Sequence, residues 1–200
     1  MSAQMVLAAL FPPSEKLRWS DELLWLPIPV SYKSDAEEDD DMNYTLPNWT
    51  KQVYPEQTEN AASYMYGYHN YELEVKKINS GYLLKKILDD GTSKIKNAES
   101  EKKLYLYSGH ESTVGYMMDA LGIAEQRVPP YGCALSFELW KLDNEYYIRL
   151  RYRNDPEATV PVDLKIPGCD VMCPHDTFTQ LLSDVIPTIP ITEACNASYE

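Results

Sequence analysis

The sequence predicts an α/β fold, and three observations support this. Residues 104–107, Leu-Tyr-Leu-Tyr, form a short and nearly unbroken apolar run, which is typical of a strand buried in a parallel sheet. The next segment, residues 112–121, has the pattern of a helix. Residues 134–140 and 146–152 alternate in polarity around Asp143-Asn144, which predicts a β-hairpin.

The other expected elements are mostly helical. In chain order they are a helix over residues 2–10, an extended Pro-rich segment over 23–30, an acidic linker to about residue 50, a mostly helical stretch over 59–90 interrupted near Gly81, a strand over 160–166 and a helix over 176–186. Within the long helical stretch, Leu83, Leu84, Ile87 and Leu88 recur at three- and four-residue spacing, so they are expected to bury one face. The tyrosines of residues 64–71 are interpreted as a packing surface.

His110 and Glu111 are the candidate chemical groups. They place an imidazole beside a carboxylate in the turn between the predicted strand at 104–107 and the following helix. In open α/β sheets, ligands bind outside the carboxyl ends of strands, and the free N–H groups of a helix N-terminus suit phosphate or another anion. The alternative is an ordinary surface turn.

Composition excludes several classes of partner. The chain has 31 acidic against 18 basic residues and a formal net charge of -13, which argues against nucleic acid and anionic membrane surfaces. No apolar run approaches the roughly 20 residues that span a bilayer, and residues 1–13 lack the basic start and cleavage site of a secretory signal. The acidic run at 35–41 is interpreted as a solvated loop.

A series of motifs runs along nearly the whole chain in one order, and together they resemble the C-terminal half of the histidine acid phosphatase family. They are Met1-Ser-Ala-Gln4, Leu10-Phe-Pro-Pro13, Leu24-Trp-Leu-Pro-Ile-Pro-Val30, Asn43-Tyr-Thr-Leu-Pro-Asn-Trp49, Tyr105-Leu-Tyr-Ser-Gly-His-Glu111, Pro129-Pro-Tyr131, Glu138-Leu139, Tyr152-Arg-Asn154, Pro167-Gly-Cys-Asp-Val-Met-Cys-Pro174 and Val185-Ile-Pro187. Residues 1–200 are therefore expected to form a partial domain of that family.

The resemblance implies an incomplete α/β sandwich of the phosphoglycerate mutase-like type. It implies hydrolysis of phosphate monoesters through a phosphohistidine, with His110 contacting the phosphate and Glu111 as proton donor to the leaving alcohol. Glu is chemically adequate where many members carry Asp, since the reference pKa values are about 4.3 and 3.9. The family also implies no cofactor or metal, a secreted or lysosomal location and frequent homodimers.

Two parts of the family pattern are absent from these residues. No Arg-His-Gly nucleophile motif occurs, nor do the phosphate-clamping arginines, and the helical insertion is missing near residues 41–43. We therefore expect residues 1–200 alone not to hydrolyse phosphate esters. The alternatives are a non-catalytic acidic glycoprotein or binding remnant, and a phosphate-transfer mutase. Without the neighbouring strand of the family, the apolar strand at 104–107 is also expected to make the chain poorly stable.

The cysteines and sequons point to the secretory pathway. By resemblance, Cys169 and Cys173 close a small disulfide loop; the alternative, a metal site with His175, has a weak ligand spacing. Cys133 and Cys195 either pair or stay free. Three sequons begin at Asn43, Asn48 and Asn196.

The remaining histidines have structural interpretations. His69 lies in a helical segment. Asp176, next to His175, is expected to be the N-cap of the last helix.

Overall fold

The computed structural model describes residues 47–125, 127–155 and 158–196. These belong to two compact units, of which the first comprises Met1–Pro55 with Leu104–Ser108 and the second Glu56–Lys103 with Gly109–Glu200. The expected helix over 2–10, the extended segment over 23–30, the acidic run and the junction near 41–43 lie outside the described residues. In the first unit, a short 3₁₀ helix, η2, spans Asn48–Gln52.

The predicted helical stretch over 59–90 is present, but its interruption lies elsewhere. It consists of α3 (Glu56–His69), α4 (Leu73–Lys76), the π-helical turn η3 (Lys77–Gly81) and α5 (Tyr82–Lys96). The break falls at residues 70–72, and near Gly81 the chain continues as a widened helix. A Cβ on Gly81 would lie 2.2 Å from the backbone oxygen of Val185, so glycine is what permits this close approach.

The sheet is small and antiparallel, so the expectation of a parallel sheet is wrong for the described residues. Its strands are β1 (Ala134–Leu142), β2 (Glu145–Arg153), β3 (Val162–Leu164) and β4 (Met172–Pro174), with β1, β3 and β4 all pairing with β2. The predicted hairpin is confirmed: Asp143 and Asn144 have φ angles of 47° and 71°, the left-handed pair that a two-residue turn requires. Strand β4 was not predicted.

The strand predicted at residues 104–107 is absent. The structure assigns no strand to residues 101–110, and Leu104 and Leu106 are exposed. An apolar run can pair as a strand only where a neighbour offers a matching edge, and the described sheet is built from other segments. The reason for expecting poor stability, a two-sided buried strand, is therefore not present in this structure. The helix predicted at 112–121 is confirmed as α6 (Glu111–Ala120).

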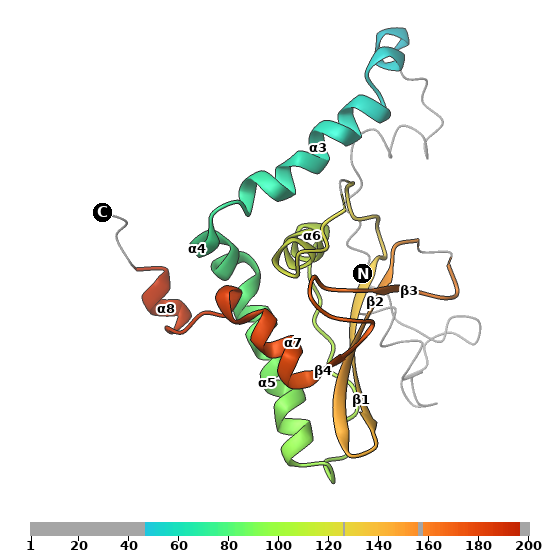
Figure 1. Cartoon of the computed structure of the whole chain (residues 1–200). Helices are drawn as coiled ribbons and strands as arrows, with labels where there is room; N and C mark the ends of the chain where they lie inside the picture. Colours follow the sequence, from blue (N-terminus) through green and yellow to red (C-terminus); the bar gives the residue numbers. More distant parts are fainter. Residues whose placement is uncertain (1–46, 126, 156–157, 197–200) are drawn as a thin grey trace, which may run out of the picture. The chain divides into compact units, whose positions relative to one another are not determined.

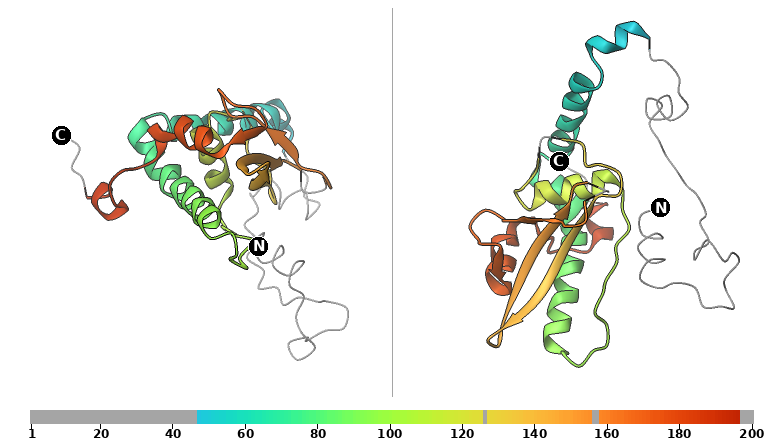
Figure 2. Two further views of the ribbon diagram at one scale, coloured as in Figure 1. Left: turned by 60° about the horizontal axis from the view of Figure 1, so that its bottom comes forward. Right: turned by 90° about the vertical axis from the view of Figure 1, so that its right-hand side faces the viewer.

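The core of the second unit lies between its helices and the inner face of the sheet. It is built from buried side chains of α5, α6, β2, α7 (His175–Leu181) and the 3₁₀ turn η4 (Ser183–Val185), and of the residues directly after α6 and α7: Leu84, Leu88, Met117, Leu121, Ile148, Leu150, Phe178, Leu182 and Val185. Leu83 and Ile87 are partly buried against it, so the predicted apolar face of α5 is confirmed. Figure 1 and the right-hand view of Figure 2 show α5 running beside the β1–β2 hairpin.

The opposite face of the sheet carries a charged network. Arg149 donates two hydrogen bonds to the carboxylate of Asp163, at 2.9 and 2.8 Å, across the β2–β3 pair. Arg151 pairs with Glu138 on β1 at 3.4 Å. Alternation along β2 therefore sends the arginines outward and Ile148, Leu150 and Tyr152 into the core.

The helix predicted over 176–186 is α7, which begins one residue earlier, at His175, and ends at Leu181. Pro174 is the residue before α7, and Asp176 lies in its first turn without a capping hydrogen bond, so the assignment of Asp176 as N-cap is wrong. Its carboxylate instead lies 3.1 Å from Nδ1 of His175. A last short helix, α8, spans Ile191–Ala194. Within the part of the chain that the structure describes, no helix combines the length and the apolar character needed to cross a bilayer.

Candidate functional site

His110 and Glu111 lie at the start of α6, as the sequence predicted. His110 has the extended backbone of a residue before a helix, with φ −93° and ψ 170°, and Glu111 is the first helical residue. The backbone N–H of His110 donates to the hydroxyl of Thr113 at 3.1 Å. A Cβ on Gly109 would lie 2.9 Å from the Thr113 side chain, so glycine lets the backbone before α6 pass close to Thr113. Both candidate side chains are exposed at this helix end.

Tyr66 connects this helix start to α3. Its ring packs on Gly115, where an added Cβ would lie 2.7 Å from the ring, and it meets Tyr116 edge-on with 6.1 Å between centroids. Partial burial raises the pKa of the Tyr66 hydroxyl, and the negative charge of Glu111 is the next cause. The sequence did not reveal this electrostatic interaction between Glu111 and Tyr66.

The thiol of Cys133 also responds to the charge of Glu111, and Tyr152 and Arg127 act on the same thiol. Burial raises the pKa of the hydroxyl of Tyr152, a residue only 1% exposed, and the neighbouring Cys133 raises that pKa further. Burial is the largest cause of the raised pKa of Cys133; the charge of Glu111 raises it further, and the positive charge of Arg127 lowers it. The thiol consequently stays protonated near neutral pH, and Arg127 supplies a positive charge to this region.

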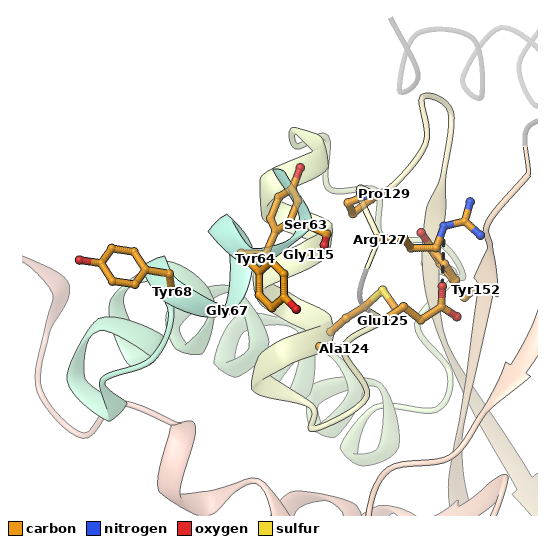
Figure 3. Close-up of a pocket in the computed structure, with 12 residues that line it drawn as sticks. Ser63, Tyr64, Gly67, Tyr68, Gly115, Ala124, Glu125, Arg127, Pro129 and Tyr152 are labelled. Carbon is orange, nitrogen blue, oxygen red and sulfur yellow. Dashed lines mark ion pairs between the residues drawn. The ribbon is translucent and has the colours of Figure 1, made fainter. Parts of the chain in front are cut away.

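A hollow of about 470 Å³ opens along the same side of α6. Glu111, Gly115 and Met118 stand at positions i, i+4 and i+7, so they share one helix face. Gly115 and Met118 line the hollow together with residues of α3, the segment 124–129 and Tyr152. Figure 3 shows Tyr64 on the α3 side and Arg127, Glu125 and Tyr152 on the opposite side, with the ion pair of Arg127 and Glu125 at 3.9 Å.

The tyrosines predicted as a packing surface divide into two groups. Tyr66 packs, as described above, but Tyr64, Tyr68 and Tyr71 are 62%, 79% and 81% exposed. Residue 63 is the only one of α3 that is fully buried, so most of this helix faces solvent. The prediction is therefore wrong for three of the four.

The other two histidines make separate contacts. His69 ends α3, with Nδ1 3.3 Å from the Tyr116 hydroxyl. His175 is buried, with Nε2 3.5 Å from the hydroxyl of Thr92 and Nδ1 beside Asp176. Within residues 47–125, 127–155 and 158–196, no cluster of three or more His, Cys, Asp or Glu side chains could hold a metal ion.

The disulfide prediction is confirmed. Cys169 and Cys173 are bonded, with 5.6 Å between their Cα atoms. Cys133 and Cys195 are not bonded to each other: Cys133 is half-buried and Cys195 is exposed.

Sequence comparisons identify relatives of this chain. Residues 44–153 match the model of the histidine phosphatase superfamily (branch 2). The chain is 27% identical to venom acid phosphatase Acph-1 of Apis mellifera, over 94% of this chain and 64% of that protein. It is also 27% identical to prostatic acid phosphatase of Rattus norvegicus, over 99% and 69%. Lysosomal acid phosphatase of Xenopus laevis is 30% identical, over 72% and 34%.

A match over more than half of the chain defines the class. The chain belongs to the histidine phosphatase superfamily, branch 2, whose named relatives here are acid phosphatases, and the predicted resemblance is confirmed. It spans 64% of the length of the venom enzyme and 69% of the rat prostatic enzyme.

Sequence reasoning did not connect Tyr66 or Cys133 with Glu111, nor Tyr152 and Arg127 with Cys133. One signal was present for the packing of Tyr66: the i, i+4, i+7 spacing of Glu111, Gly115 and Met118 leaves a gap at Gly115 where another side chain can pack. The partner that fills this gap comes from α3, at a separation of 49 positions between Tyr66 and Gly115, and spacing alone does not identify it.

Proposed function

We propose that this chain carries the acid half of an acid phosphatase site. His110 would hydrogen-bond the phosphate oxygens, and Glu111 would give its proton to the leaving alcohol oxygen. The observation that carries the proposal is the adjacent, exposed pair at the start of a ten-residue helix in a member of this family. The first-turn N–H groups of that helix favour an anion at the same place.

The reaction implied by the family needs a nucleophilic histidine as well. Its imidazole nitrogen would form the bond to phosphorus while the bond to the alcohol oxygen breaks, and Glu111 would protonate that oxygen. None of the three histidines of residues 1–200 stands in an Arg-His-Gly motif. Loss of a nucleophile costs about a millionfold in turnover in a serine protease. The 200-residue polypeptide by itself is therefore expected to show no turnover.

The test is release of 4-nitrophenol from 4-nitrophenyl phosphate near pH 5 by the purified polypeptide. Wild type, His110→Ala and Glu111→Gln are expected to give the same background rate. Turnover that either substitution abolishes would show that residues 1–200 hold a working nucleophile, and the half-site proposal would then be wrong.

A binding function is the second candidate, and Arg127 favours it. A carboxylate without a cation repels phosphate, but the thiol of Cys133 responds to the charges of both Glu111 and Arg127, so a cation acts on the same group as Glu111. Titration calorimetry with inorganic phosphate measures whether the chain binds phosphate. Saturable binding that His110→Ala weakens would support a phosphate-binding site, and absence of heat for both proteins would reject it.

We further propose that the sequons are glycosylated during passage to a secreted or lysosomal destination, and that the folded protein pairs as a homodimer. The exposure of Asn48 and Asn196 supports the first part; Asn43 lies outside the described residues. Treatment with an N-glycosidase should lower the apparent mass of the protein secreted from cultured eukaryotic cells, and an unchanged mass would contradict it. Light scattering measures the mass of the folded protein in solution and so tests whether it is a homodimer.

A further inference from the structure

The solvent side of α3 carries a row of exposed aromatic and aliphatic side chains. Ala61, Tyr64 and Tyr68 are spaced three and four positions apart, so they share one face of the helix, with Met65 beside them. Tyr64, Tyr68 and Met65 are 62%, 79% and 49% exposed, and Tyr71, just after the helix, is 81% exposed. These five residues are called the tyrosine face. Figure 3 shows the ring of Tyr68 pointing away from the other labelled residues.

The opposite side of α3 fixes the helix to α6. Tyr66 packs on Gly115, as described above. Asn70, which is fully buried, donates to the carboxylate of Asp119 at 2.7 Å and to the backbone oxygen of Tyr116 at 3.2 Å. A buried amide with these partners sets the orientation of the helix. The tyrosine face is therefore held toward solvent.

The tyrosine face lies in a segment without charged residues. Residues 60–71 contain no Asp, Glu, Lys or Arg, although these types make up 24% of the chain. Two copies of a chain with a net charge of -13 repel each other, so they can meet closely only where neither carries charge. Interface cores are rich in Tyr and Met and poor in Asp, Glu and Lys. A basic partner would find no acidic group here, so the composition favours a second copy.

An antiparallel arrangement suits two copies of this helix. It places the positive end of each helix dipole beside the negative end of the other. With Tyr64 of one copy opposite Tyr68 of the other, the small Ala61 lies opposite Tyr71, and Met65 lies opposite Gly67. A Cβ added to Gly67 would meet nothing within 4 Å, so this position has room for a side chain of the second copy.

The exposed area sets the strength of such a contact. A buried aromatic side chain contributes about 150–250 Å², so the three exposed tyrosines offer roughly 400 Å² in each copy. Two copies together would bury about 800–1,000 Å², below the roughly 1,200–2,000 Å² of stable complexes. The area therefore favours a weak, reversible dimer over a permanent one.

We propose that the tyrosine face of α3 binds the same face of a second copy of this chain, about a twofold axis that passes between Tyr64 and Tyr68. The inference rests on the homodimer included in the proposed function and names its surface. Tyr64 and Tyr68 also line the hollow beside α6, so pairing brings the second α3 to the rim of that hollow.

The test is sedimentation equilibrium of the 200-residue chain over about 5–500 µM, where a Kd on the order of 100 µM is expected. The double variant Tyr64→Glu, Tyr68→Glu places carboxylates of the two copies opposite each other and should raise Kd at least about tenfold. The double variant Tyr64→Lys, Tyr68→Lys should lose pairing in the same way. An equimolar mixture of the two variants should regain it, because opposite charges then face each other.

A matched control separates this contact from net charge. Val160→Glu with Ile191→Glu adds the same two charges at side chains that are 68% and 49% exposed and lie outside the tyrosine face. This control is expected to keep the Kd of wild type. Tyr64 and Tyr68 are exposed, so circular dichroism should show the same helix content in every variant.

Each unfavourable outcome has its own meaning. A Glu variant that pairs like wild type overturns the tyrosine face while the homodimer survives. Wild type that stays monomeric at every concentration overturns the homodimer and this surface together. Equal loss in the control, or no pairing in the mixture, overturns the twofold contact. A monomer that sediments with phosphatidylcholine vesicles, and no longer does so in the Glu variant, would assign the face to lipid and overturn the proposal.

Discussion

Replacing Gly81 by alanine tests the contact that joins the π-helical turn η3 to η4. The added Cβ would lie 2.2 Å from the backbone oxygen of Val185 and 3.0 Å from Cδ of Pro187. Both partners belong to the backbone or to a proline ring, so neither can turn away. The two segments must separate, and Val185 is part of the buried core.

The size of the effect follows from two opposing terms. Overpacking of a filled core costs about 1–3 kcal/mol, and a contact this short falls at the upper end, about 3 kcal/mol. Alanine gains about 1 kcal/mol over glycine inside a helix. The net loss in free energy of unfolding is therefore about 2 kcal/mol, which for a chain of this size lowers Tm by about 4–8 °C.

Gly91→Ala is the matched control because an added Cβ there meets nothing within 4 Å, and Gly91 also lies inside α5. Only the propensity term remains, so this variant should gain about 0.5–1 kcal/mol and about 1–4 °C in Tm. Urea unfolding followed by circular dichroism measures both variants, with unchanged m-values as the condition for comparing midpoints.

The two variants should move in opposite directions. A Gly81→Ala protein as stable as wild type, at equal m-value, would mean that the η3–η4 contact relaxes without cost, and the geometric reasoning would be wrong. A shared gain in both variants would mean that helix propensity outweighs packing at both positions.

Three further outcomes are expected. The pKa of Asp163 is held below its usual value, first by the hydrogen bonds from Arg149. This pair therefore stabilises the fold above a carboxylate's ordinary pKa of about 4, and the stability is lost as pH falls through the lower folded-state pKa. Asp163→Asn should flatten the dependence of the urea midpoint on pH between about 2 and 5, and an unaltered slope would contradict this. Burial raises the pKa of the Cys133 thiol, so iodoacetamide at about pH 8 should label the exposed Cys195 first, as read by mass spectrometry; equal rates would refute the burial of Cys133. The Ser80 hydroxyl is buried without a hydrogen-bond partner among the described residues, so Ser80→Ala should raise the free energy of unfolding by about 1 kcal/mol, and a clear loss would mean that the hydroxyl does bind a group.

Local patterns predicted the local elements well. The turn at Asp143-Asn144 and the alternation on either side specify the hairpin, because a two-residue turn with left-handed backbone sets the register of both strands. The four-residue spacing of Leu84 and Leu88 likewise specifies which face of α5 is buried. The motif around Cys169 and Cys173 indicated the disulfide through family resemblance.

The strand expected at residues 104–107 shows what a local sequence pattern cannot predict. An apolar run states that a segment prefers burial, but a strand exists only when another segment supplies the opposite edge of the ladder. The exposed tyrosines of α3 show the same limit, because aromatic content alone does not predict which rings pack against another side chain.

The sequence by itself determined the family of this protein, its acidic charge, the position of His110 and Glu111 at the start of a helix, and the hairpin. These depend on residue types and on contacts over a few positions. The tertiary structure decided that Tyr66 packs on Gly115, that Tyr152 and Cys133 interact, and that a hollow opens one turn from Glu111. Those contacts join residues 19 to 49 positions apart, and only the packing of α3, α6 and β2 brings them together.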